Sequence, residues 1–281
     1  MQHPIKLESF SAVGPGSTAN LVLATGLTYD AIYIETNLAP AEILGVKLEL
    51  NAEEIFNLTG AELVMLDQFD EVETSFAGPT YRYNLPLQFE SAVLADTQRT
   101  LSLALGPGDN CVLNVDIASG TSPVLSAFAE TGADRGKREL VRKFERYTVP
   151  VAAAGTTEFF SMNKGSRVIR MHFDSADMEG LEIVRDRLKL YELDKARNDF
   201  LLQRAGKTPQ TGYYHFDPTK RGFPIIDSFS TQAQNLVFKL SMADGGNVPV
   251  LVERLYPMPF NWSQGAATSV PTRKRRTIGR G

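Results

Sequence analysis

Two similar stretches lie nearly half the chain apart in this sequence of 281 residues. Residues 103–115 read LALGPGDNCVLNV, and residues 240–252 read LSMADGGNVPVLV. In each stretch an apolar alternation leads into a turn that contains Gly and Asn, and a second β-rich run follows. That order is typical of a β-hairpin. The pair predicts that one folding unit occurs twice in the chain.

The neighbouring segments repeat in the same order. YDAIYIE (29–35) resembles RVIRMHF (167–173), GVKLEL (45–50) resembles DRLKLY (186–191), and YRYNLP (81–86) resembles YYHFDP (213–218). A helix-like segment stands at the same place in each series, at 60–69 and at 194–206. These matches favour duplication of a half-chain, and the alternative is two unrelated all-β domains that share common strand chemistry.

The strand count indicates the fold class. Each half contains about seven or eight short segments with strand-like alternation, enough to close two antiparallel sheets over one core, together with one inserted helix. We therefore expect an all-β protein of two tandem jelly rolls, each with an inserted helix. The expected divisions are residues 1–120 for the first jelly roll, 121–143 for a Gly- and charge-rich connection, 144–257 for the second jelly roll, and 258–281 for a basic C-terminal tail.

The two helical segments carry different signals. Residues 51–72 are expected to be mostly helical, with Ile55, Leu58 and Leu63 on one side. In residues 194–206, Asp194 is the expected N-cap and Gly206 the residue that ends the helix. The expected buried face of that second helix consists of Phe200, Leu201 and Ala205.

Composition narrows the class of protein. Hydrophobic content is 43% and charged content 22%, which is typical of a globular chain. The single cysteine, Cys111, excludes a disulfide framework or a cysteine zinc cluster and is expected to be a buried, inert thiol. We see no secretory signal at the N-terminus and no apolar run long enough to span a bilayer. Synthesis in a cytosol, a host cell's included, is therefore expected.

Charge is unevenly distributed along the chain. The tail contains Arg273, Lys274, Arg275, Arg276 and Arg280 and no acid. Because the whole chain carries −4, the residues before position 271 carry −9. An acidic body with a flexible basic tail indicates attachment to an anionic surface rather than a fold that binds nucleic acid.

No catalytic constellation is visible. The three histidines, His3, His172 and His215, are scattered, and we expect no single barrel to bring two of them together, which disfavours a bicupin metalloenzyme. His172 is expected to be packed or hydrogen-bonded within a strand. The acidic group at 67–73 is expected to be a solvated loop, with calcium as the alternative ligand, although its spacing is not that of an EF-hand. Its acids are Asp67, Asp70, Glu71 and Glu73.

The second half carries a likeness to a known family. It lies in GTTEFF (155–160), in RVIRMHF (167–173) and in EIVRDRLKLYELDKARNDFLLQRAGK (182–207), followed in order by YYHFD, TQAQNLVFKL and VLVERLY. With the duplication, this order resembles the major capsid proteins of tailless, membrane-containing double-stranded DNA bacteriophages, most closely the corticovirus type. The basic tail has no counterpart in that pattern.

The resemblance implies a structural protein of the virion, not an enzyme. It implies a homotrimer whose six barrels form a pseudo-hexagonal capsomer, and capsomers that tile an icosahedral shell around an internal membrane. The implied partners are further copies of the chain, a penton or vertex protein, and the viral membrane or its proteins, without specific nucleic acid. No catalytic residue or cofactor is expected, and calcium at capsomer interfaces is the one candidate ion, with the acids at 67–73 as its ligands.

Two other functions fit a tandem β-sandwich. A viral spike or carbohydrate-binding protein needs an exposed aromatic platform or a clear metal loop, and the single Trp262 near the tail is poorly placed for one. A bicupin enzyme needs clustered histidines. A glycan-binding assay and the metal content of the purified protein distinguish these alternatives from a capsid subunit.

Overall fold

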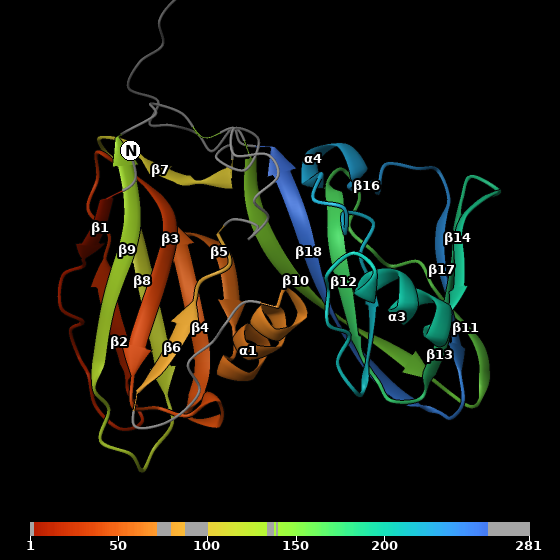
Figure 1. Ribbon diagram of the computed structural model, residues 1–281, viewed down its shortest axis with the longest axis horizontal. Helices are drawn as coiled ribbons and strands as arrows, with labels where there is room; N and C mark the ends of the chain where they lie inside the picture. Colours follow the sequence, from red (N-terminus) through yellow and green to blue (C-terminus); the bar gives the residue numbers. More distant parts are fainter. Residues whose placement is uncertain (1–2, 72–79, 88–100, 134–137, 139, 258–281) are drawn as a thin grey trace, which may run out of the picture.

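A computed structural model describes residues 3–71, 80–87, 101–133, 138 and 140–257. Two β-sandwiches lie side by side, the first half of the chain in warm colours and the second in cool colours in Figure 1. Every strand pairing between named strands is antiparallel, and there are two sheets in each half of the described chain. No helix of the described residues is long and apolar enough to cross a membrane.

The described part of the first half contains nine strands, with a 3-10 turn at Pro40–Glu42 and helix α1 at Gly60–Phe69. One sheet has the order β1-β9-β3-β6, with β7 also paired to β3, and the other has the order β2-β8-β4-β5. The strands are β1 His3–Lys6, β2 Thr18–Val22, β3 Leu27–Thr36, β4 Ile43–Leu50, β5 Glu53–Leu58, β6 Tyr81–Asn84, β7 Leu103–Leu105, β8 Cys111–Ile117 and β9 Leu125–Ala133.

The second half repeats this arrangement strand by strand. Its sheets have the orders β10-β18-β12-β15, with β16 paired to β12, and β11-β17-β13-β14. Helix α3, Lys195–Gln203, follows β14 as α1 follows β5, and a short helix α4, Pro224–Asp227, precedes β16. The strands are β10 Leu140–Val151, β11 Gly155–Phe159, β12 Arg167–Asp174, β13 Met178–Arg185, β14 Leu188–Asp194, β15 Tyr213–Phe216, β16 Phe229–Ser230, β17 Leu236–Met242 and β18 Gly246–Pro257.

Matching strand orders confirm the expected all-β fold of two tandem jelly rolls, each with an inserted helix. Period-two alternation builds the cores, as in β8, where Cys111, Leu113, Val115 and Ile117 are buried and the residues between them are half-buried. Cys111 is a buried thiol as expected, and burial raises its pKa to about 12.

The two stretches that predict hairpins are not hairpins. β7 pairs with β3, whereas β8 pairs with β2 and β4, so the turn at 106–110 crosses from one sheet to the other. The later stretch crosses in the same way, because β17 pairs with β11 and β13 and β18 with β10 and β12. The equivalent strands are β8 and β17, so the two stretches are matched one strand out of register.

Two other expectations need correction at their boundaries. The expected connection at 121–143 contains β9, which pairs with β1 and β3, so the first jelly roll continues to Ala133 and the second begins at Leu140. In the expected helix at 51–72, residues 53–58 form β5, and the helix begins only after Thr59. DRLKLY likewise leads into β14, whereas GVKLEL lies in β4, so this match is also one strand out of register.

Side-chain caps begin both inserted helices. Thr59 Oγ1 accepts a hydrogen bond from the Glu62 amide at 3.2 Å, and a Glu62 carboxylate oxygen accepts from the Thr59 amide at 2.7 Å. Asp194 caps α3 by accepting from the Arg197 amide at 2.8 Å, as predicted, and Gly206 has the left-handed φ of 73° that the predicted role requires. The predicted buried face of α3 is wrong, because Phe200 is 57% exposed and Leu201 38% exposed.

The sheet β10-β18-β12-β15 is covered on both faces. One face packs on the core of the second half, and the other lies against α1 and β5 of the first half. Val141 of β10 and Leu251 of β18 belong to the hydrophobic cluster of the first half, and Phe56 of β5 meets Phe144 of β10 edge to face at 6.1 Å. The two jelly rolls therefore share a buried interface, which holds the site described next.

Candidate functional site: the buried ionic network between the jelly rolls

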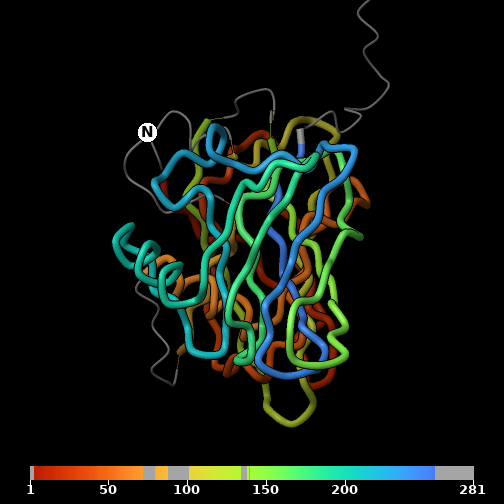
Figure 2. The backbone as a smooth tube through the Cα atoms, turned by 90° about the vertical axis from the view of Figure 1, so that its right-hand side faces the viewer, coloured from red at the N-terminus to blue at the C-terminus, as the bar shows by residue number. Residues whose placement is uncertain are grey.

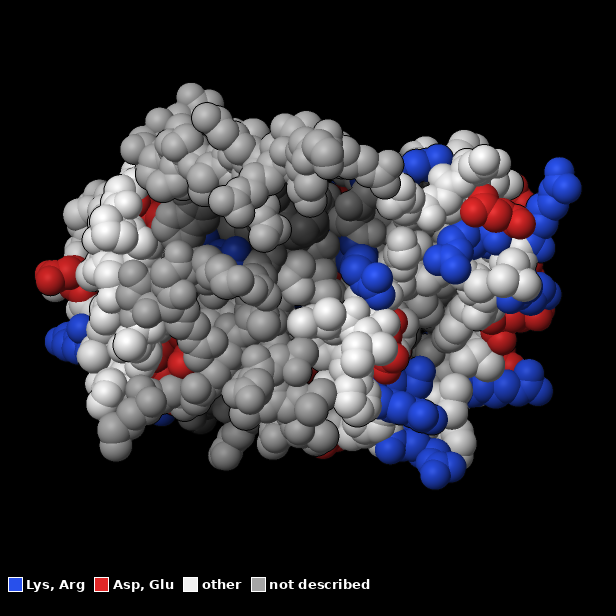
Figure 3. Space-filling model, turned by 90° about the horizontal axis from the view of Figure 1, so that it is seen from above, with Lys and Arg blue, Asp and Glu red and all other residues white. Residues whose placement is uncertain are grey.

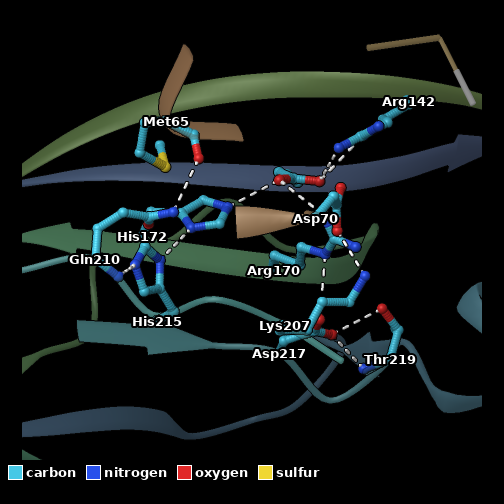
Figure 4. A network of polar contacts seen from close by, with 11 residues as sticks. Met65, Asp70, Arg142, Arg170, His172, Lys207, Gln210, His215, Asp217 and Thr219 are labelled. Atoms are coloured by element: carbon cyan, nitrogen blue, oxygen red, sulfur yellow. Dashed lines mark hydrogen bonds and ion pairs between the residues drawn. The ribbon is translucent and has the colours of Figure 1, made fainter. Parts of the chain in front are cut away.

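A fully buried carboxylate lies at the centre of this interface. Glu253 of β18 accepts hydrogen bonds from Arg142 Nε at 3.0 Å and Arg142 Nη2 at 2.6 Å, and its other oxygen lies 2.8 Å from His172 Nε2. Figure 4 shows the Arg142 and His172 side chains, which come from β10 and β12 on either side of β18. The alternation of the strands explains the arrangement, because Val252 and Arg254 point toward the core of the second half while Glu253 points toward the first.

Arg170 of β12 extends the network into the first half. Its Nη1 donates to Asp70 Oδ2 at 2.7 Å, and its Nε lies 3.3 Å from Asp217 Oδ2. Lys207 donates to the other Asp70 oxygen at 2.6 Å. Asp70, at the C-terminal end of α1, is therefore held by two cations from the second half. We call the set Asp70, Arg142, Arg170, His172, Lys207, His215, Asp217 and Glu253 the interdomain network.

The turn after α3 brings its backbone to the same point. The Thr208 amide donates to Phe69 O at 3.0 Å, and the Thr208 hydroxyl donates to Glu71 Oε1 at 2.7 Å. Gln210 Nε2 donates to Met65 O at 3.3 Å. The capped helix α1 and the glycine turn at Gly206 thus meet end to end, which joins the two halves through backbone as well as through charge.

The two buried histidines form a directed chain of hydrogen bonds. His172 and His215 are register partners on β12 and β15, and their Nδ1 atoms lie 2.7 Å apart. The backbone N–H of Gln210 donates to His215 Nε2 at 3.4 Å. His215 therefore carries its proton on Nδ1 and donates it to His172. His172 then donates from Nε2 to Glu253. The chain therefore runs from the backbone of Gln210 through both imidazoles to the Glu253 carboxylate.

The pKa values follow from burial and partners. Burial raises the pKa of Glu253, but Arg142, Arg170 and His172 outweigh it and hold that pKa well below the ordinary value. For Asp70, likewise, Arg170 and Lys207 outweigh burial and lower the pKa. Burial dominates at Asp217, whose pKa is raised. Burial and the neighbouring His172 lower the pKa of His215 to about 2.

Phe69 packs against the middle of the network and is fully buried. Its ring centroid lies 4.6 Å from that of His215 and 5.4 Å from that of His172, and the Arg170 guanidinium lies 5.3 Å from it. An apolar ring over these groups keeps water from them and strengthens each ion pair through the low local dielectric.

A pocket of about 130 Å³ adjoins His172. Its walls come from both halves, with Met65 of α1 opposite Tyr213 and Leu251 of the second half, and Glu62 and Asp174 contribute carboxylates. Glu62 is bonded by Arg146 across the interface, with Nε to Oε1 at 3.0 Å. The pocket is an opening in the interdomain contact rather than a separate cleft.

The structure separates the predicted calcium ligands. Asp67 is buried in α1, Asp70 belongs to the interdomain network, Glu71 accepts from Thr208, and Glu73 lies outside the described residues. The expectation of a solvated loop is thus wrong for Asp67, which is buried in α1, and for Asp70, which pairs with cations of the second half, whereas Glu71 is exposed. The basic tail, Arg273, Lys274, Arg275, Arg276 and Arg280, also lies outside the described residues.

The expectation that no barrel brings two histidines together is wrong. His172 and His215 meet because strands 43 residues apart in sequence pair in register. They do not form a cupin centre, because their nitrogens are already bonded to each other, to Glu253 and to Gln210. Across the part of the chain that the structure describes, no group of three or more His, Cys, Asp or Glu is placed to hold a metal ion.

The sequence contains a signal for this network that is easily overlooked. RVIRMHF and VLVERLY each place charged or polar residues inside an otherwise apolar strand. In a strand with one face on the core and the other in solvent, the solvent-facing residues are mostly polar. Apolar residues on both faces, interrupted by Arg170, His172 and Glu253, are typical of a sheet covered on both sides.

Comparison with known proteins agrees with this architecture. The fold is similar to that of the major capsid protein P2 from bacteriophage PM2, with a TM-score of 0.82 and 22% identity over 93% of this chain and 99% of that chain. It is also similar to STIV MCP, with a TM-score of 0.67 and 9% identity over 95% of this chain and 100% of that chain. For PBCV-1 VP54 the values are 0.64 and 11% over 91% and 93%. A search of curated protein sequences finds no match.

Family models give the assignment at the level of sequence. The model for the viral coat protein P2 N-terminal domain matches residues 4–132, and the model for its C-terminal domain matches residues 141–258. These ranges contain β1–β9 and β10–β18 almost without remainder. Two matched domains in the right order confirm the predicted resemblance and a structural rather than enzymatic role: the chain belongs to the viral coat protein P2 family.

Proposed function

We propose that three copies of this chain form a capsomer with six jelly rolls and a pseudo-hexagonal outline, and that such capsomers tile an icosahedral shell. The observation that carries the proposal is that the two halves have the same strand order in both of their sheets. Two equivalent barrels per chain give a threefold assembly six similar outer faces, which suits a lattice of near-sixfold contacts.

The interdomain network supports this role. A capsomer of six barrels needs the two barrels of each chain at a fixed angle. Buried ion pairs between Asp70, Arg142, Arg170 and Glu253 have directional geometry, and α1 meets the turn after α3 through backbone hydrogen bonds. Such contacts restrict the relative orientation of two domains more than an apolar contact alone does.

The basic tail suggests the remaining partner. We propose that Arg273, Lys274, Arg275, Arg276 and Arg280 attach the shell to an internal viral membrane, through phospholipid headgroups or acidic segments of membrane proteins. Each charge near an anionic bilayer contributes about 1 kcal/mol, weakened by salt. A vertex protein and, at capsomer contacts, calcium are further proposed components of such a shell.

The test is assembly of the purified full-length chain. Light scattering should show trimers at micromolar concentration, and electron microscopy should show closed shells under assembly conditions. A chain that stays monomeric at micromolar concentration and physiological salt would contradict the proposed capsomer.

A further inference from the structure

The two halves can be aligned residue by residue through their irregularities. β-Bulges occur between Tyr29 and Ala31 and between Val168 and Arg170, at equivalent places on β3 and β12. The pairings of β4 with β5 and of β13 with β14 also shift at equivalent places, after Leu48 and after Ile183. The helix caps Thr59 and Asp194 fix the same offset for α1 and α3.

This alignment shows a contrast in burial. Ile55, Met65 and Leu66 of the first half are 2%, 5% and 3% exposed. Their equivalents in the second half remain apolar but lie at the surface, with Leu190 36%, Phe200 57% and Leu201 38% exposed. Leu188, beside them on β14, is 62% exposed. Figure 2 shows α3 projecting from the side of the second half. We call these four residues the α3–β14 surface.

Part of this difference in exposure arises because the second half covers α1 of the first half. Met65 belongs to the same apolar cluster as Leu251 and lines a pocket with Tyr213 and Leu251, on the outward face of the sheet β10-β18-β12-β15. That face has an equivalent in the first half, on the sheet β1-β9-β3-β6. There, the register places Tyr33 at the position of His172 and Phe128 at the position of Leu251. These two rings stack at 4.8 Å, and both are partly exposed.

We infer that the α3–β14 surface of one chain docks on the Tyr33 and Phe128 face of a second copy, repeating between chains the contact that the two halves make within one chain. The inference rests on the proposed trimer and assigns its interface. Each copy offers one surface and receives one, so the contact is head-to-tail, and a ring of six equivalent barrels closes at three chains.

We expect apolar side chains to stabilise this contact between copies, because the ion pair between the halves of one chain has no equivalent there. Within the chain Glu62 pairs with Arg146, and the equivalent residues are Arg197 and Lys6, which have the same sign. Seen from above, the second half bears many basic side chains (Figure 3). Salt screens repulsion between like charges, so we expect the trimer to persist, and to tighten, as salt is raised.

The first test is the change Phe200→Asp, with Ile226→Asp as the matched control. Ile226 is 75% exposed on α4, outside the α3–β14 surface. Sedimentation should show Phe200→Asp with a trimer dissociation constant raised at least about tenfold and the control unchanged, since a central apolar anchor is costly to replace by a charge. Trimers of Phe200→Asp as tight as those of the unaltered chain would overturn the inference. A monomeric unaltered chain would instead contradict the proposed trimer itself.

The second test uses two variants together. Phe128→Arg removes the receiving face and Phe200→Asp removes the offering surface, and circular dichroism first establishes that both chains are folded; Tyr33→Arg replaces Phe128→Arg if that chain is not. At concentrations where neither weakened variant associates alone, a head-to-tail contact predicts that their mixture forms dimers through the one intact contact. Folded variants that form no dimer when mixed would overturn the inference.

Discussion

Replacing Glu253 by Gln removes the central charge of the interdomain network while preserving its shape. The carboxylate is fully buried and accepts three hydrogen bonds, two from Arg142 and one from His172, with Arg170 Nη1 3.9 Å away. Its loss removes a buried negative charge that Arg142, His172 and Arg170 share, and it places an amide NH2 where an acceptor oxygen stood. Breaking a buried pair in this way costs about 3–5 kcal/mol of unfolding free energy.

Urea denaturation followed by circular dichroism at pH 7 measures this loss. The matched control is Glu182→Gln in the same half, where the carboxylate pairs with Lys189 at 3.3 Å and Lys239 at 3.2 Å on the surface. An exposed pair contributes about 1 kcal/mol or less, so the control should change little. A loss below about 1 kcal/mol for Glu253→Gln, or equal losses for both variants, would refute the reasoning that the buried charges hold the halves together.

Three further changes test other parts of the account. Between about pH 6 and pH 4 the unfolded chain takes up a proton at His215, whose folded pKa of about 2 keeps it neutral, so unfolding free energy should fall by up to about 1.4 kcal/mol per pH unit; urea titrations should show this dependence weakened in His215→Gln. Asp194→Ala removes the cap of α3 and should lower the thermal midpoint by an amount that corresponds to about 1 kcal/mol, with the nearby exposed Glu192→Ala nearly neutral; equal effects would argue against capping. Deleting residues 272–281 should leave trimers intact and reduce sedimentation with anionic liposomes, as high salt does; unchanged liposome binding would contradict the proposed role of the tail.

The repeated architecture could be predicted from the sequence, because strand alternation, turn residues and helix caps are local signals. The order of segments was sufficient to predict two jelly rolls with inserted helices and to place the N-cap at Asp194. Register was harder, since short apolar strands resemble one another. Two of the sequence matches are displaced by one strand. They are the match of 103–115 with 240–252 and the match of 45–50 with 186–191.

The site depended on contacts between distant segments. Alternation in RVIRMHF does not reveal that its second face is covered by another half of the chain, so Arg170 and His172 could not be assigned to an interface from sequence. The prediction of the buried face of α3 was wrong for a related reason. Phe200 and Leu201 are apolar but are not buried within one chain. An apolar residue does not by itself require burial, and the second half of this chain leaves Phe200 and Leu201 exposed.

The mass of the native assembly tests the central claim most directly. Native mass spectrometry of the full-length chain, at micromolar concentration and physiological ionic strength, should give a dominant species with three times the mass of one chain. Particles assembled from it should contain the chain in multiples of three. A dominant monomer, or a dimer with twofold symmetry, would contradict the account of a duplicated jelly roll that builds a threefold capsomer.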